Sequence, residues 1–459
     1  MPATYLSEAS RMTHFDDIVI GGGVAGTTVA NGLAANQRHV AIIEERDWGG
    51  TTINRGSTPK KALLAIAETH HQLVRLQGNG FDAVPTINWR TAGNIRDQLI
   101  MDESTRTKTR LLANNVTTIE GHAVVVDPHT ISVQGSRYQT DDLIIASGAK
   151  PRVLTFPGNQ YVGHSATLLR AHELPARIVI LGAGIIAFAL ASIASEAGAK
   201  VTIIQHDKAA LRAFDQAFVT KLMSQLKRQH VTFIFDAQVQ QISKNDSGLS
   251  VTIVQADQTT DITTDACYNV TGRVSNIAGF GLEDLPVQTS THGIHVSATL
   301  QSTVPSIWAV GDCNDAAVPK LSAYAIYQGK YLVRQLTGVD HYPIDYPVPA
   351  MTVFSIPKLG QVGVATQTAE QNPNAYTIQS IDAANWQTYA RFNQRPTLLK
   401  LVRRRSDGHI VGMTVLGDQA DILVNDFALL LNGKIDETAL QRMIFAYPSM
   451  ADDLYGLWQ

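Results

Sequence analysis

The sequence predicts an α/β protein built around two copies of a strand–turn–helix unit. In the first copy, an apolar strand enters a glycine-rich turn and then a helical pattern at residues 17–26. The second copy repeats this pattern at residues 177–187. The length of 459 residues is enough for about three domains with sizeable cores. These observations exclude a small module and favour a duplicated nucleotide-binding architecture.

Composition narrows the classes of partner. Apolar residues make up 44% of the chain and charged residues 17%, which is ordinary for a globular protein and excludes a disordered or fibrous chain. The formal net charge is −3 and no long basic run occurs, so the sequence lacks the cluster of positive charge that is typical of proteins binding nucleic acids or anionic membranes. We therefore expect small-molecule partners, no nucleic acid and no membrane.

Cysteine usage and the N-terminus both predict a cytoplasmic protein. Cys267 and Cys313 are too few for a disulfide framework, and the chain starts without the basic segment and apolar core of a secretory signal. No cysteine pair has the spacing of metal ligands, so we expect no metal. Residues 1–14 are expected to be a polar leader outside the fold, with Met12 as a candidate start.

Residues 178–194 form the most apolar stretch, with Ser192 as their one polar residue. Their 17 residues approach the ~20 that span a bilayer. We prefer a strand, a turn at Gly182 and Gly184, and a helix, because a buried parallel strand also reads as a continuous apolar run.

The first turn has the spacing Gly-x-Gly-x-x-Gly at Gly21, Gly23 and Gly26. These glycines permit a tight turn, close approach of a pyrophosphate and packing of helix on strand, and the helix N-terminus offers unpaired N–H groups to the phosphates. The strand at 40–44 ends in Glu44, 23 residues after Gly21, where an acid would accept both hydroxyls of a ribose. We predict a dinucleotide site.

The second turn keeps this pattern at Gly182, Gly184 and Ala187, and the strand at 201–205 ends in Gln205, again 23 residues after the first glycine. Two such sites in one chain are typical of a flavoprotein that takes electrons from a nicotinamide. Two Rossmann folds without cofactors are the alternative.

Further segments make the chain similar to the pyridine nucleotide-disulfide oxidoreductase family; they are residues 48–61, 144–148, 269–273, 307–312, 353–357, Gly363 and residues 446–452. The resemblance covers the chain from Phe15. It implies two Rossmann-like dinucleotide-binding domains, one for FAD at 15–150 and 274–345 and one for NAD(P)H at 151–273. It also implies an α+β dimerisation domain at 346–459, and hence a homodimer.

The resemblance assigns roles to individual residues. Glu44 would bind the adenosine ribose of FAD and Asp312 the flavin ribitol. The apolar strand before Asp312 agrees with this, because a carboxylate buried there without a ligand would be costly. The other implied cofactor contacts are Gly50, Thr51, Ala123, Ser147, Gly148, Gly311, Gly272 and Arg273.

The redox-active thiols of the family are missing. Members that reduce disulfides carry two cysteines, separated by four residues, directly after Gly-Gly-Thr, where this chain has Thr52 and Ser57. A hydroxyl cannot become the thiolate that relays electrons. Cys267 and Cys313 are expected to be buried small hydrophobes. Cys313 follows Asp312, so it is the one that could approach the flavin.

The acid–base pair of the family is also changed. Its C-terminal histidine and glutamate correspond here to Tyr447 and Asp452. Tyrosine, with a pKa near ~10, is a poor proton shuttle at neutral pH. With no thiolate to make, there is no proton for a histidine to move. The segment from Tyr447 to Asp452 resembles the corresponding segment of soluble transhydrogenases more closely than that of the disulfide reductases.

The nicotinamide side departs from the family in two further places. Ile185 stands where a tyrosine covers the flavin, and Ala189 replaces a glutamate that pairs with the lysine near flavin N5. Lys60 or Lys61 would lie by N5 without its partner, and such a cation favours the anionic reduced flavin. A solvated helix face is the alternative for both lysines.

The loop after Gln205 favours NADPH over NADH. An amide replaces the carboxylate that would repel a 2′-phosphate, and His206, Lys208 and Arg212 follow it. The segment around Arg212 resembles that of NADPH-dependent glutathione reductases, although the loop is one residue longer and lacks their leading arginine.

Three functions remain open. The first is an FAD enzyme that passes electrons from NAD(P)H directly to a small-molecule acceptor, as a diaphorase, quinone reductase, oxidase or transhydrogenase. The second is a flavin-binding redox sensor with little turnover, and the third is a disulfide reductase, which only fold-level analogy supports. No signature in the sequence names the acceptor.

Overall fold

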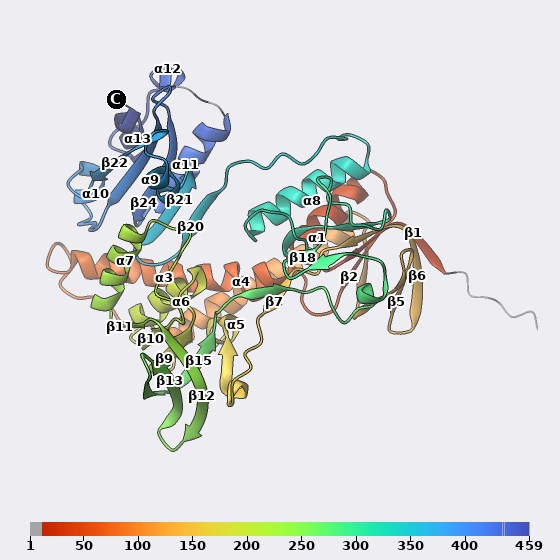
Figure 1. Ribbon diagram of the computed structural model, residues 1–459, viewed down its shortest axis with the longest axis horizontal. Helices are drawn as coiled ribbons and strands as arrows, with labels where there is room; N and C mark the ends of the chain where they lie inside the picture. The colour runs from red at the N-terminus through yellow and green to blue at the C-terminus, as the bar shows by residue number, and fades with distance from the viewer. Residues whose placement is uncertain (1–11, 434, 436, 459) are drawn as a thin grey trace, which may run out of the picture. The chain divides into compact units, whose positions relative to one another are not determined.

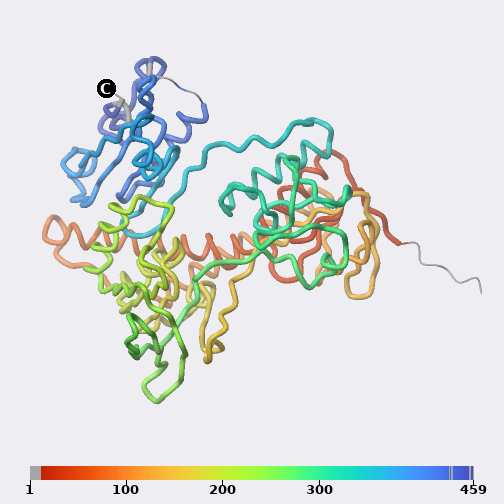
Figure 2. The backbone as a smooth tube through the Cα atoms, in the orientation of Figure 1, coloured from red at the N-terminus to blue at the C-terminus, as the bar shows by residue number. Residues whose placement is uncertain are grey.

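The computed structural model describes residues 12–433, 435 and 437–458. The chain divides into two compact units. Unit 1 contains Met1–Pro59, Asp97–Arg152 and Arg273–Asp345, and unit 2 contains Lys60–Arg96, Val153–Gly272 and Tyr346–Gln459. Each unit therefore combines three separated stretches of chain, which Figure 2 traces by colour. Residues 1–11, most of the expected leader, lie outside the described residues.

Unit 1 is built on a sheet with the strand order β3-β2-β1-β6-β5-β4, and β19 pairs with β6. Figure 1 labels β1, β2, β5 and β6 of this sheet. Its strands are β1 (Thr13–Ile20), β2 (Val40–Glu44), β3 (Thr117–Glu120), β4 (Ala123–Asp127), β5 (Thr130–Val133), β6 (Ser136–Ile145) and β19 (Ile307–Ala309). The pairs β1–β2, β2–β3, β1–β6 and β6–β19 are parallel. The carboxyl ends of β1, β2 and β19 consequently meet at one edge.

The helices and minor strands of unit 1 complete this layer structure. They are α1 (Val24–Ala35), α2 (Gly50–Asn54), α8 (Ser322–Leu336), β7 (Ala149–Pro151), β16 (Arg273–Ser275), β17 (Thr289–Ser290), β18 (Gly293–Ile294) and the short 3₁₀ turns η2 (Leu282–Asp284) and η3 (Gly311–Cys313). The long helix α4 (Trp89–Ala113) begins in unit 2 and ends in unit 1. One core lies between α1, α8 and the sheet, and a second lies on the other face of the sheet.

The first strand begins before the expected domain start at Phe15. Thr13 and His14 pair in parallel register with Tyr138 and Gln139 of β6. The expected leader of residues 1–14 is therefore too long by these two residues, because backbone pairing with β6 extends the strand beyond its apolar part.

Unit 2 contains the second nucleotide-binding sheet, with the strand order β11-β10-β9-β15-β8, all parallel. Its strands are β8 (Val162–His164), β9 (Arg177–Leu181), β10 (Lys200–Ile204), β11 (Val231–Ile234) and β15 (Ala266–Asn269), and an antiparallel sheet contains β12 (Ala237–Asn245), β13 (Gly248–Gln255) and β14 (Gln258–Thr264). The helices around these sheets are α3 (Ser57–Leu76), α5 (Ser165–Leu169), α6 (Ile185–Glu196), α7 (Gln216–Arg228) and the 3₁₀ turn η1 (Asn159–Tyr161).

The apolar stretch at 178–194 is strand β9, a turn and helix α6, as predicted. Helix α6 is mostly apolar because most of it lies inside a core that it shares with Leu64 and Ala67 of α3. Among the described residues, no helix is long and apolar enough to cross a membrane.

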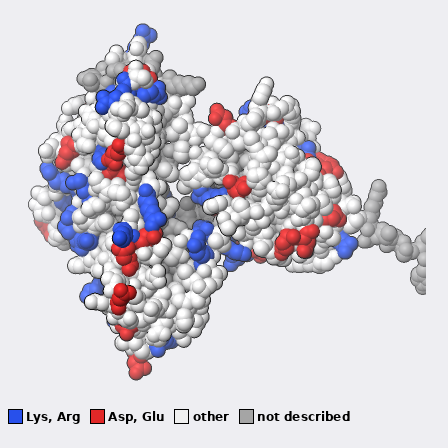
Figure 3. All heavy atoms as spheres, viewed as in Figure 1, with Lys and Arg blue, Asp and Glu red and all other residues white. Residues whose placement is uncertain are grey.

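The C-terminal part of unit 2 is an α+β layer. Its antiparallel sheet has the order β20-β21-β24-β23-β22, with β20 (Ala350–Val353), β21 (Lys358–Gly363), β22 (Tyr376–Asp382), β23 (Leu398–Arg404) and β24 (Ile410–Gly417). Helices α9 (Thr366–Gln371), α10 (Gln387–Ala390), α11 (Ala420–Gly433), α12 (Glu437–Leu440) and α13 (Met450–Trp458) accompany it. On the face shown in Figure 3, acidic and basic residues are interspersed, in keeping with the small net charge.

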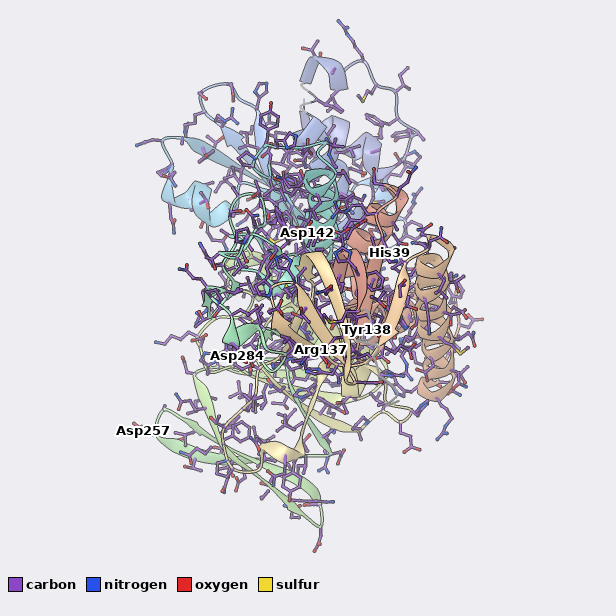
Figure 4. All side chains as sticks on the ribbon, turned by 90° about the vertical axis from the view of Figure 1, so that its right-hand side faces the viewer. His39, Arg137, Tyr138, Asp142, Asp257 and Asp284 are labelled. Atoms are coloured by element: carbon purple, nitrogen blue, oxygen red, sulfur yellow. The ribbon has the colours of Figure 1, made fainter. Side chains whose placement is uncertain are left out.

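A buried ion pair fixes the amino end of the unit 1 sheet. Arg38 donates from Nε to Asp17 Oδ2 at 2.5 Å and from a terminal nitrogen to Asp142 Oδ2 at 3.1 Å. Asp142, labelled in Figure 4, also accepts a hydrogen bond from Trp308 Nε1 at 2.9 Å. Burial raises the pKa of Asp17 to about 6, although Arg38 opposes this rise. Ionised Asp17 is therefore tolerated only because Arg38 is present.

We expect Arg38→Ala to lower the free energy of unfolding by about 3 kcal/mol at neutral pH, because the Asp17 carboxylate is left buried without its cation. A carboxyl with a raised folded-state pKa is stabilising when protonated, so the loss should shrink as the pH falls through about 6. Urea unfolding of unit 1, followed by fluorescence at neutral and mildly acidic pH, measures this. Asp17→Asn buries no charge and should cost less; an equal or larger loss would contradict the argument.

Candidate functional site

The first glycine-rich turn connects β1 to α1. Gly21 has φ +111°, and a Cβ on it would lie 2.4 Å from Ala146 O. A Cβ on Gly26 would lie 2.0 Å from Gly21 O, so the helix can approach the turn this closely only without a side chain. Beside Gly23, by contrast, a Cβ would meet only Gly50 Cα, at 4.0 Å. The turn is therefore tight on the protein side and open beside Gly23.

Glu44 is brought to this turn by β2. Its Oε2 accepts a hydrogen bond from Gly22 N at 2.7 Å, and its Oε1 accepts one from Arg46 N at 2.8 Å. Burial raises the pKa of Glu44, although these backbone hydrogen bonds oppose the rise. A further backbone hydrogen bond joins Gly49 N to Gly22 O at 2.8 Å. The backbone N–H of Gly22 is thus held by the last residue of β2, and its carbonyl by the segment that follows β2.

Asp312 lies just beyond the end of β19, as predicted. Gly311 has φ +79° and donates from its backbone to Gln328 Oε1 at 2.7 Å, which fixes the turn that carries Asp312. Burial raises the pKa of Asp312, against the opposing effect of Arg273 and Lys320. Within the described residues, the Asp312 carboxylate has no ion pair. The sequence did not reveal Gln328, a buried amide on a distant helix.

These residues fit FAD. A glycine turn at a helix N-terminus suits a pyrophosphate, and the Glu44 carboxylate suits the hydroxyls of a ribose. The half-buried Asp312 carboxylate has no hydrogen-bond donor among the described residues, and a polyhydroxyl chain would supply one. Gln328, which the sequence missed, supports the turn, and Glu44 and Asp312 are the predicted residues whose chemistry suits such a ligand.

The other predicted contacts of unit 1 are spread along the chain. Arg273 donates to Ala149 O, and its guanidinium lies 3.5 Å from Thr51 Oγ1. Ser147 Oγ donates to Asn276 O at 2.6 Å. Gly148 and Gly50 have positive φ values, +70° and +58°, and a Cβ built on Gly148 would meet nothing within 4 Å. Ala123 is buried at the start of β4. The side chain of Ala123 thus belongs to the core and offers no polar group.

Hydroxyls occupy the positions of the missing thiols. Thr52 Oγ1 lies 2.9 Å from Ser322 Oγ, and Ser57 is the exposed first residue of α3. Cys313 is fully buried, and its Sγ donates to Ile145 O and Val310 O.

Both thiols of the chain are poor thiolates. Burial raises the pKa of Cys313 to about 11 and that of Cys267 to about 12. Each is far above neutral pH, so neither cysteine supplies a nucleophile under ordinary conditions.

The second glycine-rich turn repeats the first. Gly182 has φ +101°, and a Cβ on Gly184 would meet nothing within 4 Å. Gln205 Oε1 accepts a hydrogen bond from Ala183 N at 3.0 Å, as Glu44 does from Gly22 N. Leu211 N donates to Ala183 O at 3.1 Å, as Gly49 N does to Gly22 O. The internal repeat thus extends into the loops. The second loop, between Gln205 and Leu211, is one residue longer than the first, between Glu44 and Gly49.

The loop after β10 contains a carboxylate that the sequence analysis did not consider. Asp207 forms an ion pair with Arg212, and its Oδ2 lies 3.3 Å from His206 Nε2. Gln205 Nε2 donates to the same oxygen at 3.2 Å. Arg212, predicted to bind a phosphate, therefore already has a partner. Gly272, with φ +137°, stands in open space after β15.

The residues predicted for the nicotinamide side lie around α3 and α6. Ile185 is 43% exposed at the start of α6, whereas Ala189 is fully buried. Lys60 is half-buried and has no ion pair among the described residues, and burial lowers its pKa. Burial also lowers the pKa of Lys61 to about 8, and its ammonium group lies over the ring of Phe354. Neither lysine lies on a fully solvated face.

The C-terminal pair lies near the surface of unit 2. Tyr447 is 75% exposed, and its hydroxyl donates to Gln387 Oε1 at 2.9 Å. Asp452 lies in the first turn of α13, and its backbone N donates to Ser449 Oγ at 3.3 Å. Among the residues described in this chain, no histidine stands in for the acid–base group of the reductases at this segment.

Two family models match the chain. The model for pyridine nucleotide-disulphide oxidoreductases matches residues 15–329, and the model for their dimerisation domain matches residues 349–455. The chain belongs to the pyridine nucleotide-disulphide oxidoreductase family. It is accordingly a flavoprotein oxidoreductase, of a family that uses FAD and a pyridine nucleotide. The predicted mixed α/β fold, with Rossmann-like domains and a dimerisation domain, is confirmed.

Curated relatives match over nearly their full lengths. A dihydrolipoyl dehydrogenase of Geobacillus stearothermophilus is 26% identical over 445 residues, 95% of this chain and 94% of the relative. A glutathione reductase of Burkholderia cepacia is 26% identical over 453 residues, 96% of this chain and 98% of the relative. Among solved structures, the HOCl-induced flavoprotein disulfide reductase RclA from Escherichia coli has a TM-score of 0.87 and 24% identity, covering 97% of this chain and 99% of that chain. At that identity the likeness establishes the fold alone.

We expect Glu44→Ala to weaken FAD binding by about 1.5 to 3 kcal/mol, because a charged acceptor of hydrogen bonds is removed from the turn. The measurement is FAD affinity after removal and reconstitution, by fluorescence quenching. Glu45→Ala is the matched control, since Glu45 pairs with exposed His122 instead of the turn. Wild-type protein that takes up no FAD, or equal losses in both variants, would contradict the assignment.

Proposed function

We propose that this flavoprotein accepts hydride from NAD(P)H and passes the electrons directly to a small-molecule acceptor, without a redox disulfide. The observation that carries the proposal is the chemistry of the thiol positions. Thr52 and Ser57 stand where the disulfide-reducing members have cysteines, and the two cysteines of the chain are buried with strongly raised pKa values. Diaphorase, quinone reductase, oxidase and transhydrogenase reactions all need only this direct route.

The loss of the acid–base histidine agrees with the direct route. Reduction of a disulfide requires proton transfer to a leaving thiolate, which Tyr447 performs poorly at neutral pH. An acceptor that takes hydride or single electrons from a flavin needs no such group. The names of some relatives indicate disulfide chemistry in those proteins. In this chain, Thr52, Ser57 and Tyr447 disfavour a disulfide reductase.

Each residue of the site has a role in this proposal. Bound FAD would supply the hydride-accepting ring. Glu44 would hold the adenosine ribose, Asp312 the ribitol, and the N–H groups of the turn at Gly23 the pyrophosphate. Lys60 would place a positive charge near flavin N5, which favours the anionic reduced flavin. The exposed Ile185 would meet the nicotinamide where other members use tyrosine.

A flavin-loaded redox sensor is the second candidate. The residues that relatives use for turnover are changed together, at Thr52, Ser57, Ile185, Ala189 and Tyr447. Anaerobic rapid mixing with NADPH or NADH separates the two functions. Bleaching of the flavin absorbance on the timescale of turnover supports the enzyme, and no bleaching with either nucleotide supports the sensor.

We further propose that the enzyme is a cytoplasmic homodimer, assembled through residues 346–459. The match to a dimerisation domain supports the contact, and the scarcity of cysteines supports the compartment.

Reduction by NAD(P)H should give reduced FAD without a thiolate charge-transfer band, because hydroxyls at 52 and 57 cannot donate that charge. Turnover with an artificial acceptor should survive iodoacetamide applied to the reduced enzyme, and glutathione disulfide should not be reduced above background. The paired variant Thr52→Cys/Ser57→Cys is the positive control and should produce the band. Inactivation by alkylation mapped to Cys313 or Cys267 would show that a relocated thiol carries the electrons.

Light scattering at micromolar concentration should give a mass of two chains, because the family match places a dimerisation domain at the C-terminal end. A full-length monomer at this concentration would contradict the prediction.

NADPH should have a lower apparent Michaelis constant than NADH, because Gln205 brings no charge against a 2′-phosphate and cations follow it. Arg212→Ala should weaken NADPH selectively, by about 1 to 3 kcal/mol, if its guanidinium binds the phosphate. Steady-state kinetics with both nucleotides tests this. Equal losses for NADPH and NADH in the variant would show that the phosphate is bound elsewhere.

A further inference from the structure

Arg212 is engaged by a carboxylate inside the very loop that would meet the nucleotide. Asp207 pairs with its guanidinium, although the Arg212 side chain is 65% exposed and the Asp207 side chain only 27%. The same Oδ2 accepts from Gln205 Nε2 at 3.2 Å and lies 3.3 Å from His206 Nε2. Asp207 thus faces three of the groups expected to meet the adenosine end of NAD(P)H.

The loop holds this arrangement in place. Leu211, buried and with φ +45°, donates from its backbone to Ala183 O at 3.1 Å. Gln205 Oε1 accepts from Ala183 N at 3.0 Å. The residues on both sides of Asp207 are therefore fixed to the glycine-rich turn, which limits how far Arg212 can move from the carboxylate.

The other carboxylate of this segment has a different task. Asp215 is buried, caps α7 by accepting a hydrogen bond from Phe218 N at 2.9 Å, and pairs with Lys400 at 2.6 Å. Lys208 is exposed and has no ion pair within the described residues. Of the two carboxylates in residues 205–215, Asp207 is therefore the one whose charge can act on a ligand at this loop.

We propose that Asp207 sets the discrimination between NADPH and NADH, as the internal counter-ion of Arg212. This inference rests on the proposed use of NAD(P)H. A 2′-phosphate can bind Arg212 only in competition with Asp207, and its negative charges are repelled by that carboxylate. A free 2′-hydroxyl meets neither penalty. The native chain therefore prefers NADPH less strongly than the number of its cations suggests.

Adenosine fragments test this without hydride transfer. Calorimetric titration of the FAD-loaded protein compares 2′,5′-ADP, which carries the 2′-phosphate, with 5′-AMP, which lacks it. Asp207→Asn keeps the size and one acceptor oxygen but removes the charge. It should bind 2′,5′-ADP about 5- to 10-fold more tightly, as expected for releasing a surface ion pair and a nearby repulsion. Its affinity for 5′-AMP should change less than about twofold.

Asp246→Asn is the matched control. Asp246 is exposed in the tight turn between β12 and β13, so this variant removes an equal charge. The neighbouring Ser247 accepts a hydrogen bond from Arg177, which begins β9, whereas the glycine-rich turn follows the other end of β9. Both fragments should bind this variant as they bind the wild type. Arg212→Ala should also cost more 2′,5′-ADP affinity in the Asp207→Asn background than in the wild type, because the arginine is then free to bind phosphate.

Each outcome bears on the proposal. Unchanged or weaker 2′,5′-ADP binding by Asp207→Asn, or an equal gain for 5′-AMP, overturns it. Asp207→Ser, which also lacks the charge, serves as the second variant if the first does not fold, with the same expected result. Fragment binding as expected without flavin reduction would sink the proposed enzyme activity and leave the role of Asp207 standing. No 2′,5′-ADP binding to either uncharged variant would overturn that role.

Discussion

A hydrogen bond between the side chain that ends one strand and the backbone amide of a glycine-rich turn organises both nucleotide-binding halves of this protein. In one half Glu44 accepts from Gly22, and in the other Gln205 accepts from Ala183. This bond adds to the backbone bonds from Gly21 N to Ile43 O and from Gly182 N to Ile204 O, both at 2.8 Å, which also tie each turn to the neighbouring strand. Because the bond needs only an acceptor oxygen, a carboxylate and an amide serve equally well. The charge at that position is thereby free to vary with the nucleotide.

The proposed redox chemistry depends on a different constraint, the burial of the two cysteine side chains. Cys313 lies next to Asp312, where a thiolate could have met the flavin. Its Sγ instead points to the backbone carbonyls of Ile145 and Val310 inside the core, and its pKa is about 11. A thiol held in that way packs as an apolar group. The family scaffold is retained, but Thr52 and Ser57 stand at the positions of its redox-active cysteines, so under the proposed function the flavin alone transfers the electrons.

Local patterns in the sequence were sufficient for the fold class, both turns and the strand-end residues Glu44, Gln205 and Asp312. Each depends on neighbours close in the chain, namely an apolar strand, glycine spacing and a helix start. The supports that the sequence missed are long-range. Gln328 reaches Gly311 from a helix 17 residues away, and the pairing of Asp207 with Arg212 depends on how an exposed loop folds back. Neither contact leaves a periodic signal in the sequence.

The extra residue in the second loop has a consequence for how such enzymes diversify. Gln205 and Leu211 are both hydrogen-bonded to the backbone of Ala183, so both ends of the segment between them are held by one residue of the turn. Its length differs from the loop between Glu44 and Gly49, yet the anchoring is the same. Evolution or a protein engineer can therefore alter the length and charge of residues 206–210 while both hydrogen bonds to Ala183 keep the glycine-rich turn in place.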